Sequence, residues 1–159
     1  MRKGKDTASQ AGKDTASCVR ACAVSCGTLV CDADGRLLLG HVTGTACWDI
    51  PKGMRDPGET TLAAAMRELR EECGAVFAPE RFADLGEFAY RRDKRLHLYR
   101  VEAGNELGDL SQLACTSWFP HHKTGRPTLE MDAFRWAGRA EVSRLCWPRM
   151  ANLLLALDW

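Results

Sequence analysis

The chain has 159 residues, and its 22 basic residues nearly balance its 21 acidic ones, which gives a formal net charge of +1. The fractions of hydrophobic (45%) and charged (27%) residues are typical of a globular protein and exclude collagen-like and largely disordered classes. The length suits a single domain. No overall positive field would recruit nucleic acid or an anionic membrane, so we expect neither as a partner and leave the oligomeric state open.

A direct repeat opens the chain, because Gly4-Lys-Asp-Thr-Ala-Ser9 recurs at positions 12–17. Two short polar copies bury nothing, so residues 1–17 are predicted to be a flexible tail and 18–159 a single domain. The N-terminus lacks the apolar segment of a signal peptide, and no apolar run approaches the roughly 20 residues of a membrane span. We therefore expect a cytoplasmic protein.

Strand patterns precede and follow one long helix pattern. Small and β-branched residues predict a strand over 20–31, a turn at 32–35 and a returning strand over 36–42. The remaining expected elements are a helix at about 60–73, strands at 84–91 and 95–103, an irregular insertion at 104–128, a short strand at 134–136, and helices at 139–146 and from Pro148. This order predicts a mixed sheet with helices on both faces.

The cysteines are expected to be reduced and structural. They occupy positions 18, 22, 26, 31, 47, 73, 115 and 146 without a Cys-x-x-Cys pair, which disfavours zinc or a disulfide framework. The adjacent pair His121 and His122 is expected to be solvated.

The long helix carries both apolar and acidic faces. Thr60 or Thr61 can cap its N-terminus, and Gly74 suits the left-handed residue after its end. A spacing of three and four predicts a buried stripe of Leu62, Ala65, Met66, Leu69 and Cys73. The same spacing clusters Glu68, Glu71 and Glu72 on a neighbouring face, while Arg67 and Arg70 are expected to project to the other side. Clustered carboxylates suit hard divalent cations, although a solvated acidic face would look similar.

The segment preceding the helix resolves that ambiguity. Together the two match Gly-x5-Glu-x7-Arg-Glu-U-x-Glu-Glu-x-Gly-U, where U is a bulky aliphatic residue, through Gly53, Glu59, Arg67, Glu68, Leu69, Glu71, Glu72 and Gly74. The chain therefore resembles the Nudix hydrolases, with the box at 53–75. One departure is Ala75 at the final aliphatic position, followed by Val76. This departure affects a packing position rather than the chemistry.

The resemblance implies an α/β/α sandwich around a mixed β-sheet, and hydrolysis of a nucleoside diphosphate linked to another moiety. It implies more than one Mg²⁺ or Mn²⁺ ion, held by Glu68, Glu71, Glu72 and the backbone carbonyl of Lys52. Such ions neutralise phosphate oxygens and lower the pKa of the attacking water. One carboxylate of the box or of a distal loop would be the general base. Gly53, Glu59 and Gly74 would support the structure, and Arg67, within the catalytic set, would brace the loop against the helix with Glu59.

Segments outside the box bear on the substrate. Trp48-Asp-Ile-Pro-Lys-Gly53 is similar to the Trp-x-x-Pro-Lys-Gly segment of diadenosine and diphosphoinositol polyphosphate hydrolases, in which Lys52 would meet a phosphate chain. Trp48 is otherwise a core anchor. Glu130-Met-Asp-Ala-Phe-Arg-Trp136 resembles a segment of asymmetrical diadenosine tetraphosphate hydrolases. That likeness makes Glu130 the expected distal metal ligand and catalytic carboxylate, with Asp132 as its alternative.

Tyr90 and Lys94 belong to an aromatic and basic stretch that could stack a base and hold outer phosphates, although a surface hairpin would look the same. The favoured substrates are dinucleoside polyphosphates such as diadenosine tetraphosphate, cleaved to ATP and AMP. Alternatives are a diphosphoinositol polyphosphate, a nucleoside triphosphate in a house-cleaning role, or the 5′ end of RNA. Near-neutral charge argues weakly against RNA. A nucleotide-sensing module without catalysis is disfavoured by the intact glutamates.

Overall fold

The computed structural model describes residues 22–159, so the expected tail at 1–17 with its repeat, and Cys18, lie outside the described residues. The large sheet comprises β1 (Ala23–Asp32), β2 (Leu37–Val42), β3 (Trp48–Asp49), β4 (Lys52–Met54), β5 (Ala83–Arg91), β6 (Lys94–Gly104) and β9 (Met131–Ala137). A separate hairpin is formed by β7 (Trp118–Pro120) and β8 (Pro127–Leu129). The helices are α1 (Thr61–Cys73), α2 (Arg139–Leu145) and α3 (Pro148–Leu155), with short 3₁₀ turns at Pro79–Arg81 and Leu110–Gln112.

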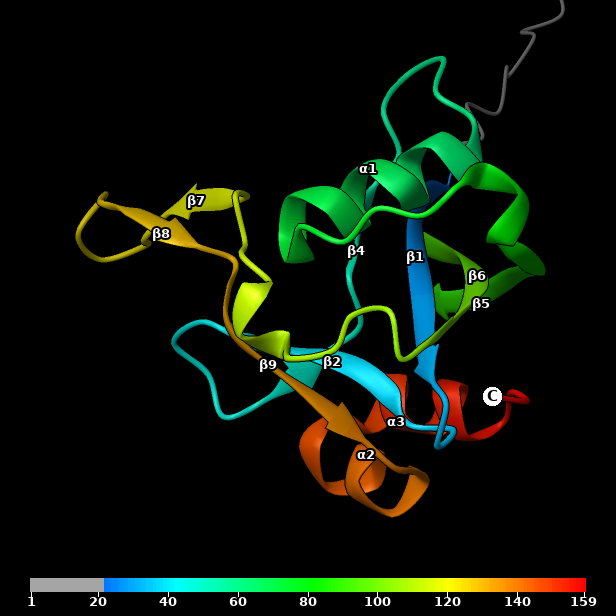
Figure 1. Ribbon diagram of the computed structural model, residues 1–159. Helices are drawn as coiled ribbons and strands as arrows, with labels where there is room; N and C mark the ends of the chain where they lie inside the picture. The colour runs from blue at the N-terminus through cyan, green and yellow to red at the C-terminus, as the bar shows by residue number, and fades with distance from the viewer. Residues whose placement is uncertain (1–21) are drawn as a thin grey trace, which may run out of the picture.

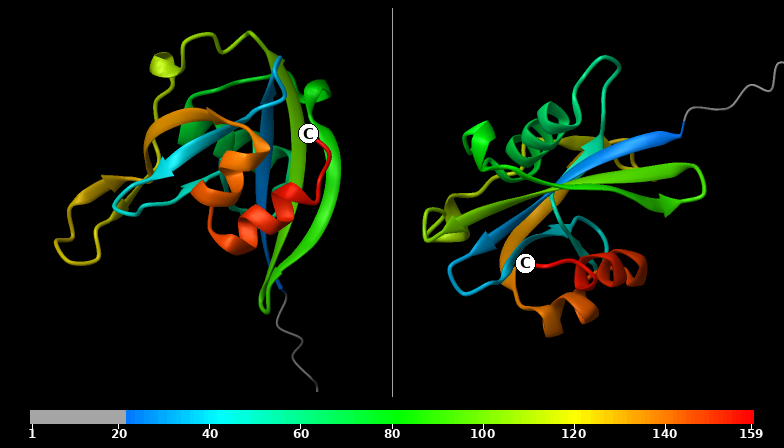
Figure 2. Two further views of the ribbon diagram at one scale, coloured as in Figure 1. Left: turned by 90° about the horizontal axis from the view of Figure 1, so that it is seen from below. Right: turned by 90° about the vertical axis from the view of Figure 1, so that its right-hand side faces the viewer.

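The large sheet is mixed, because β1 pairs parallel with β6 and antiparallel with β2 and β4. The strand order is β3-β2-β1-β6-β5, with β4 beside β1 and β9 beside β2. Helix α1 covers one face, and α2 and α3 cover the other (Figures 1 and 2). The predicted α/β/α sandwich is therefore confirmed.

Side chains of β1 point alternately to the two faces of the sheet and contribute to a hydrophobic core on each face. Cys26 and Val30 face α1 and pack in one cluster with Leu69, whereas Leu29 faces α3 and packs in the other with Leu154. Side chains of a strand point alternately to opposite faces, so a central strand covered on both sides is apolar at nearly every position. In the described part of the chain, no helix is long and apolar enough to cross a membrane.

Helix α1 has the predicted ends. The Thr60 side chain accepts a hydrogen bond of 3.1 Å from the backbone N–H of Ala63, and Gly74 adopts the left-handed conformation with φ of +75°. The cap satisfies one of the N–H groups left without a partner in the first turn. The predicted apolar stripe packs toward the sheet, with Ala65, Leu69 and Cys73 fully buried.

Two parts of the fold differ from the sequence expectations. The short strands β3 and β4 were not expected, and the insertion at 104–128 ends in the β7–β8 hairpin rather than being irregular throughout. Strands of two or three residues are too short to show a periodic pattern. The hairpin also contains Pro120 and Pro127, which normally weigh against a strand and are tolerated here because it belongs to a two-stranded sheet with open edges.

Candidate active site

Strand β4 brings the segment before the box against helix α1. The backbone N–H of Lys52 donates a hydrogen bond of 2.9 Å to the Glu72 carboxylate, and the carbonyl of Pro51 accepts one of 3.0 Å from Thr28. Glu72 is only 3% exposed. The turn that begins the box is thus held between the central strand and a buried carboxylate.

Gly53 is required by a close approach rather than by an unusual backbone angle. A Cβ built at this position would lie 2.1 Å from the carboxyl carbon of Glu68. Glu68 is itself buried, with 7% of its surface exposed. The glycine therefore provides the space in which this carboxylate sits.

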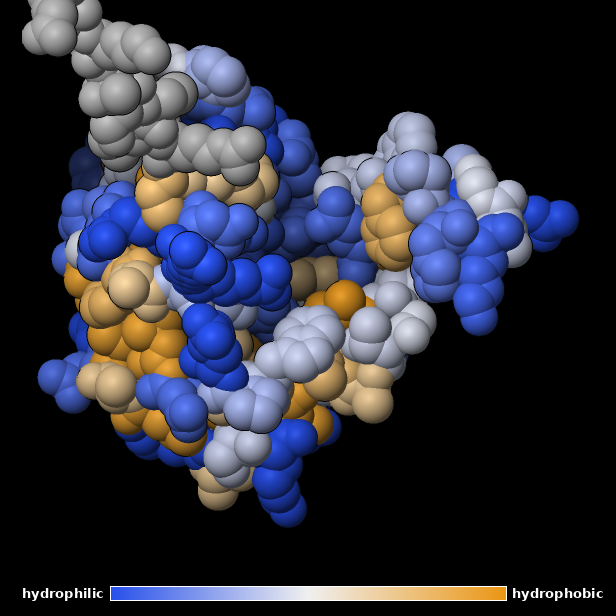
Figure 3. Space-filling model, turned by 180° about the vertical axis from the view of Figure 1, so that it is seen from behind, coloured by the Kyte–Doolittle hydropathy of each residue, from blue (hydrophilic) through white to orange (hydrophobic). Residues whose placement is uncertain are grey.

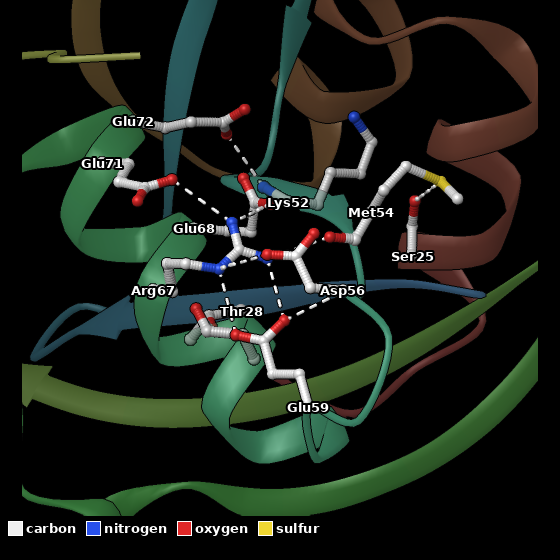
Figure 4. Close-up of polar contacts among 11 residues, drawn as sticks. Ser25, Thr28, Lys52, Met54, Asp56, Glu59, Arg67, Glu68, Glu71 and Glu72 are labelled. Atoms are coloured by element: carbon white, nitrogen blue, oxygen red, sulfur yellow. Dashed lines mark hydrogen bonds and ion pairs between the residues drawn. The ribbon is translucent and has the colours of Figure 1, made fainter.

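Arg67 lies among the acidic side chains, and the expectation that it projects to the other side of the helix was wrong (Figure 4). Its guanidinium donates to Glu59 at 3.0 Å, to Glu68 at 2.7 Å and to Glu71 at 3.2 Å, and also to the carbonyl of Met54. Positions 67 and 71 are four apart and share a helix face, which explains the contact. Hydrogen bonds to Glu59, then to Glu68, raise the pKa of Arg67.

Glu130 reaches the box carboxylates from outside the helix. Burial raises the pKa of Glu72 to about 9; Lys52 opposes the shift, and the hydrogen bond and charge of Glu130 add to it. Burial also raises the pKa of Glu68, against the effect of Arg67. Glu72 and Glu130 thus form a close pair of carboxylates.

The position of Glu130 is set by residues 116–117, which cross the end of α1 and are called the strap here. The backbone N–H groups of Thr116 and Ser117 donate to the carbonyl of Glu71, at 2.6 and 3.1 Å, and Glu130 donates to the carbonyl of Ser117 at 3.0 Å. The strap satisfies a carbonyl that lacks a partner in the last helical turn. Asp132, the alternative to Glu130, instead lies 2.5 Å from His41 Nδ1. The structure therefore places Glu130, and not Asp132, beside the box.

A larger cavity of about 620 Å³ adjoins the carboxylates. It is lined by acidic, basic and aromatic groups: Asp49, Glu72 and Glu130; Lys52, Arg91, Lys94 and Arg149; and Tyr90, Phe119 and Trp147. Lys52, Lys94 and Glu130 also line the smaller hollow around Glu68 and Glu71, so the two spaces share a boundary. Figure 3 shows that the surface is hollowed between the main body and the projecting hairpin.

The two lysines on that boundary differ in their surroundings. Lys52 Nζ is 2.8 Å from the buried Asp49 carboxylate. Burial by itself would lower the pKa of Lys52, but the charge and hydrogen bond of Asp49, together with the charge of Glu72, outweigh burial and raise this pKa. Burial, followed by the positive charges of Lys52 and Arg91, lowers the pKa of Lys94. Lys94 therefore has a surplus of positive neighbours that a bound anion would relieve.

Predicted substrate residues divide between the cavity and the core. Tyr90, Lys94 and Lys52 line the cavity, whereas Trp48 packs beside His41, with ring centroids 5.2 Å apart, and under the Arg135 guanidinium at 5.5 Å. Trp48 is not among the cavity-lining residues, so the structure favours its alternative as a core anchor.

Three residues that line the cavity were not predicted from the sequence: Phe119, Trp147 and Arg149. Arg91 lies within the predicted aromatic and basic stretch from Tyr90 to Lys94, and Pro148 was predicted only to begin a helix. The sequence signal for Trp147 was a large aromatic residue just before a helix, where no neighbouring residue in the sequence buries it.

Comparison with known proteins identifies the family. The profile of the NUDIX domain matches residues 23–146, which include the box, the strap and the cavity lining apart from Trp147, Pro148 and Arg149. The chain belongs to the Nudix family.

The chain is also similar to individual known proteins. The chain is 42% identical over 154 residues to an RNA pyrophosphohydrolase of Halorhodospira halophila, covering 84% of this chain and 82% of that one. It is 31% identical over 140 residues to an uncharacterised 17.7 kDa protein of phage T4, covering 82% and 92%. A Caenorhabditis elegans Ap4A hydrolase structure superposes with a TM-score of 0.59 at 19% identity, covering 82% and 92%, and shows the fold alone. The protein is a Nudix hydrolase of the pyrophosphohydrolase type.

Nudix enzymes generally use divalent metals, and the donors here are of the kind those ions prefer. Four glutamates, two of them buried, are accompanied by one guanidinium. Hard cations take carboxylate and carbonyl oxygens. Within residues 22–159, no three acidic, histidine or cysteine side chains are grouped closely enough to hold an ion as they stand, and Glu68 and Glu71 accept hydrogen bonds from Arg67. The donor chemistry fits divalent ions.

The cysteines and the histidine pair lie apart from the carboxylates. The seven cysteines in the described residues are free. His121 and His122 stack with centroids 4.8 Å apart in the loop at the tip of the hairpin.

Proposed function

We propose that the protein hydrolyses a phosphoanhydride bond in a nucleotide that carries an extended 5′ polyphosphate. The observation that carries this proposal is the shared boundary of the two spaces, where Lys52, Lys94 and Glu130 line both the aromatic cavity and the carboxylate hollow. If a nucleoside occupied the larger cavity, its phosphates would extend past Lys52 and Lys94 to the glutamates of the carboxylate hollow.

The cavity supplies the groups that such a ligand needs. Trp147, Phe119 and Tyr90 offer aromatic surface for a base, and Lys94, Arg91 and Arg149 offer positive charge for phosphate oxygens. Lys52 is already paired with Asp49, so it is held in place for the phosphates as a fixed donor.

Glu68, Glu71, Glu72 and Glu130, with the backbone carbonyl of Lys52, would hold the Mg²⁺ or Mn²⁺ ions. When bound, these ions would neutralise phosphate oxygens and lower the pKa of the attacking water. The close pair of Glu72 and Glu130 supplies the general base, since one carboxylate of the pair can accept the proton of the water. Arg67 and Glu59 hold the loop to the helix and do not meet the substrate.

Two substrate classes suit this arrangement. Dinucleoside polyphosphates, such as diadenosine tetraphosphate, are favoured by the segment from Glu130 to Trp136, and a cytoplasmic enzyme would encounter them. The 5′ end of RNA is the second candidate, because curated relatives at 28–42% identity are named RNA pyrophosphohydrolases. Both classes would present phosphoanhydride bonds on a 5′ carbon to the glutamates.

The test is a substrate panel run with wild type and Glu72→Gln. It comprises diadenosine polyphosphates, nucleoside triphosphates, ADP-ribose, a diphosphoinositol polyphosphate and 5′-triphosphorylated RNA, each with Mg²⁺ or Mn²⁺. Loss of the carboxylate should lower turnover by about 10²- to 10⁴-fold on every substrate that is cleaved. Glu80→Gln is the matched control, because Glu80 is exposed and remote. Equal rates for wild type and Glu72→Gln would refute the assignment.

A further inference from the structure

The outer face of the β7–β8 hairpin is an exposed apolar strip. Trp118 lies opposite Leu129, and Pro120 lies opposite Pro127. All four side chains are exposed, with Trp118 at 61% and Leu129 at 45%. Monomeric proteins rarely leave a tryptophan so exposed beside a second large apolar residue without a use for it.

The tip of the hairpin is basic. Residues 117–129 contain Lys123, Arg126, His121 and His122 and no aspartate or glutamate. Neither Lys123 nor Arg126 forms an ion pair with any residue in the range 22–159. In a chain with a net charge of +1, this segment is a local positive site that complements an anionic chain.

The hairpin is anchored at the catalytic glutamates and extends away from them. Thr116 and Ser117 bind the Glu71 carbonyl, and β8 ends at the residue before Glu130. Phe119 on the inner face lines the cavity, and Trp118 next to it lies on the outer face. The hairpin therefore presents one aromatic side chain to the cavity and the next one to solvent.

We propose that the β7–β8 hairpin binds single-stranded nucleic acid, holding nucleotides that follow the one in the cavity. Trp118 would stack on a base, and Lys123 and Arg126 would contact backbone phosphates. Exposed aromatic residues interspersed with positive charge are the general means of binding single strands. This inference rests on the proposed function and deepens it, because it selects a 5′-polyphosphorylated strand over a dinucleotide. The near-neutral total charge is no obstacle, since the positive charge is local.

The first experiment measures binding alone. A fluorescein-labelled ten-nucleotide single-stranded RNA with a 5′ hydroxyl group has no anhydride to cleave, and its anisotropy is titrated with the full chain. Trp118→Ala should weaken binding about tenfold or more. Lys123→Ala/Arg126→Ala should lower the slope of log affinity against log salt by about 1.4. Arg70→Ala/Arg144→Ala, which removes two exposed charges elsewhere, should bind as wild type does.

The second experiment measures hydrolysis. Trp118→Ala should raise the KM for 5′-triphosphorylated RNA at least tenfold and leave the KM for ATP and for diadenosine tetraphosphate unchanged. An equal rise in the KM for diadenosine tetraphosphate would overturn the proposal, because the hairpin would then hold the second nucleoside of a dinucleotide. The proposal would also be overturned if neither hairpin variant changed the affinity for RNA. It would be overturned likewise if the sole effect of Trp118→Ala were a loss of self-association.

The two proposals fail separately. If wild type cleaves diadenosine tetraphosphate but does not bind the 5′-hydroxyl RNA, the hairpin proposal falls and the proposed function stands. If the RNA binds through Trp118 but no anhydride is cleaved, the hairpin proposal stands and the proposed function falls. The hairpin side chains are exposed, so circular dichroism and thermal unfolding should match wild type in every variant.

Discussion

The backbone N–H of Lys52 donates a hydrogen bond to the carboxylate of Glu72, twenty positions along the chain, at 2.9 Å. This contact fixes the distance between the segment that precedes the box and the helix that ends it. It also leaves the Lys52 side chain directed to Asp49 and the cavity. One residue therefore joins the carboxylate hollow to the larger binding space.

Replacing Gly53 by alanine should damage the site more than the fold. The new Cβ would meet the carboxyl group of Glu68 at 2.1 Å, so this carboxylate must move from its place. Because displacement of a catalytic group by about 1 Å can cost 10²-fold, we expect turnover to fall by about that factor. The measurement is kcat with Mg²⁺ on any cleaved nucleotide.

Gly138→Ala is the matched control, since no atom lies within 4 Å of its Cβ position. Its kcat should equal that of wild type. A Gly53→Ala enzyme with unchanged kcat would show that the position of Glu68 is not critical.

Removing the charge of Arg67 should destabilise the metal-free protein. Arg67→Gln leaves Glu59, Glu68 and Glu71 without their shared partner, and loss of one member of a mostly buried ion pair costs about 3 kcal/mol. Urea unfolding in EDTA should show this loss. Added Mg²⁺ should restore more stability to the variant than it adds to wild type, because a cation can replace the missing charge.

Arg70→Gln, on the exposed side of α1, is the control and should change the free energy of unfolding by less than about 0.5 kcal/mol. A variant at Arg67 as stable as wild type in EDTA would contradict its role as the brace.

Asp32 should contribute stability that depends on pH. Burial alone would raise the pKa of its carboxyl, but hydrogen bonds from the Arg36 backbone N–H and side chain, together with the Arg36 charge, lower the pKa below its ordinary value. A lowered folded-state pKa means that the unfolded chain binds the proton more readily. The stabilisation is therefore complete above the unfolded-state pKa of about 3.9 and is lost as pH falls through the folded-state pKa.

Asp32→Asn should lower the free energy of unfolding at pH 7 by about 1.5–3 kcal/mol, as expected for hydrogen bonds to a charged group. The gap from wild type should close as acid protonates Asp32. Asp34→Asn, whose side chain is 73% exposed, should show little effect. A gap that does not change between pH 7 and pH 2 would contradict the assignment.

Ala75 marks a space that a larger aliphatic side chain can fill. It is 4% exposed, packs in the core under α1 and lines a pocket of about 290 Å³ together with Met66 and Phe82. Ala75→Val should raise the free energy of unfolding by about 1.6 kcal/mol, since each of the two added carbon groups contributes about 0.8 kcal/mol when buried.

Thermal unfolding checks this prediction, and Val76→Ala is the comparison, because Val76 is 70% exposed and should be almost neutral. A lower melting temperature for Ala75→Val would mean that the pocket cannot accept the added volume.

The sequence by itself determined the helix and its chemistry. The spacing of Glu68, Glu71 and Glu72, the cap at Thr60 and the glycine at position 74 are local features, and helical geometry converts them directly into faces and ends. The Nudix resemblance added the sandwich and the reaction class for the same reason, because the box is one continuous stretch of chain. Lys94 and Tyr90 were found through the aromatic and basic character of their own strand.

Only the tertiary structure decided which distant residues meet. The choice of Glu130 over Asp132 depends on a strap bonded to the end of α1. The presence of Trp147 rather than Trp48 at the cavity depends on how α3 packs in the core on its side of the sheet. The β7–β8 hairpin likewise has no periodic signal of its own. These features arise from contacts between segments far apart in the chain, which residue spacing along a single element does not encode.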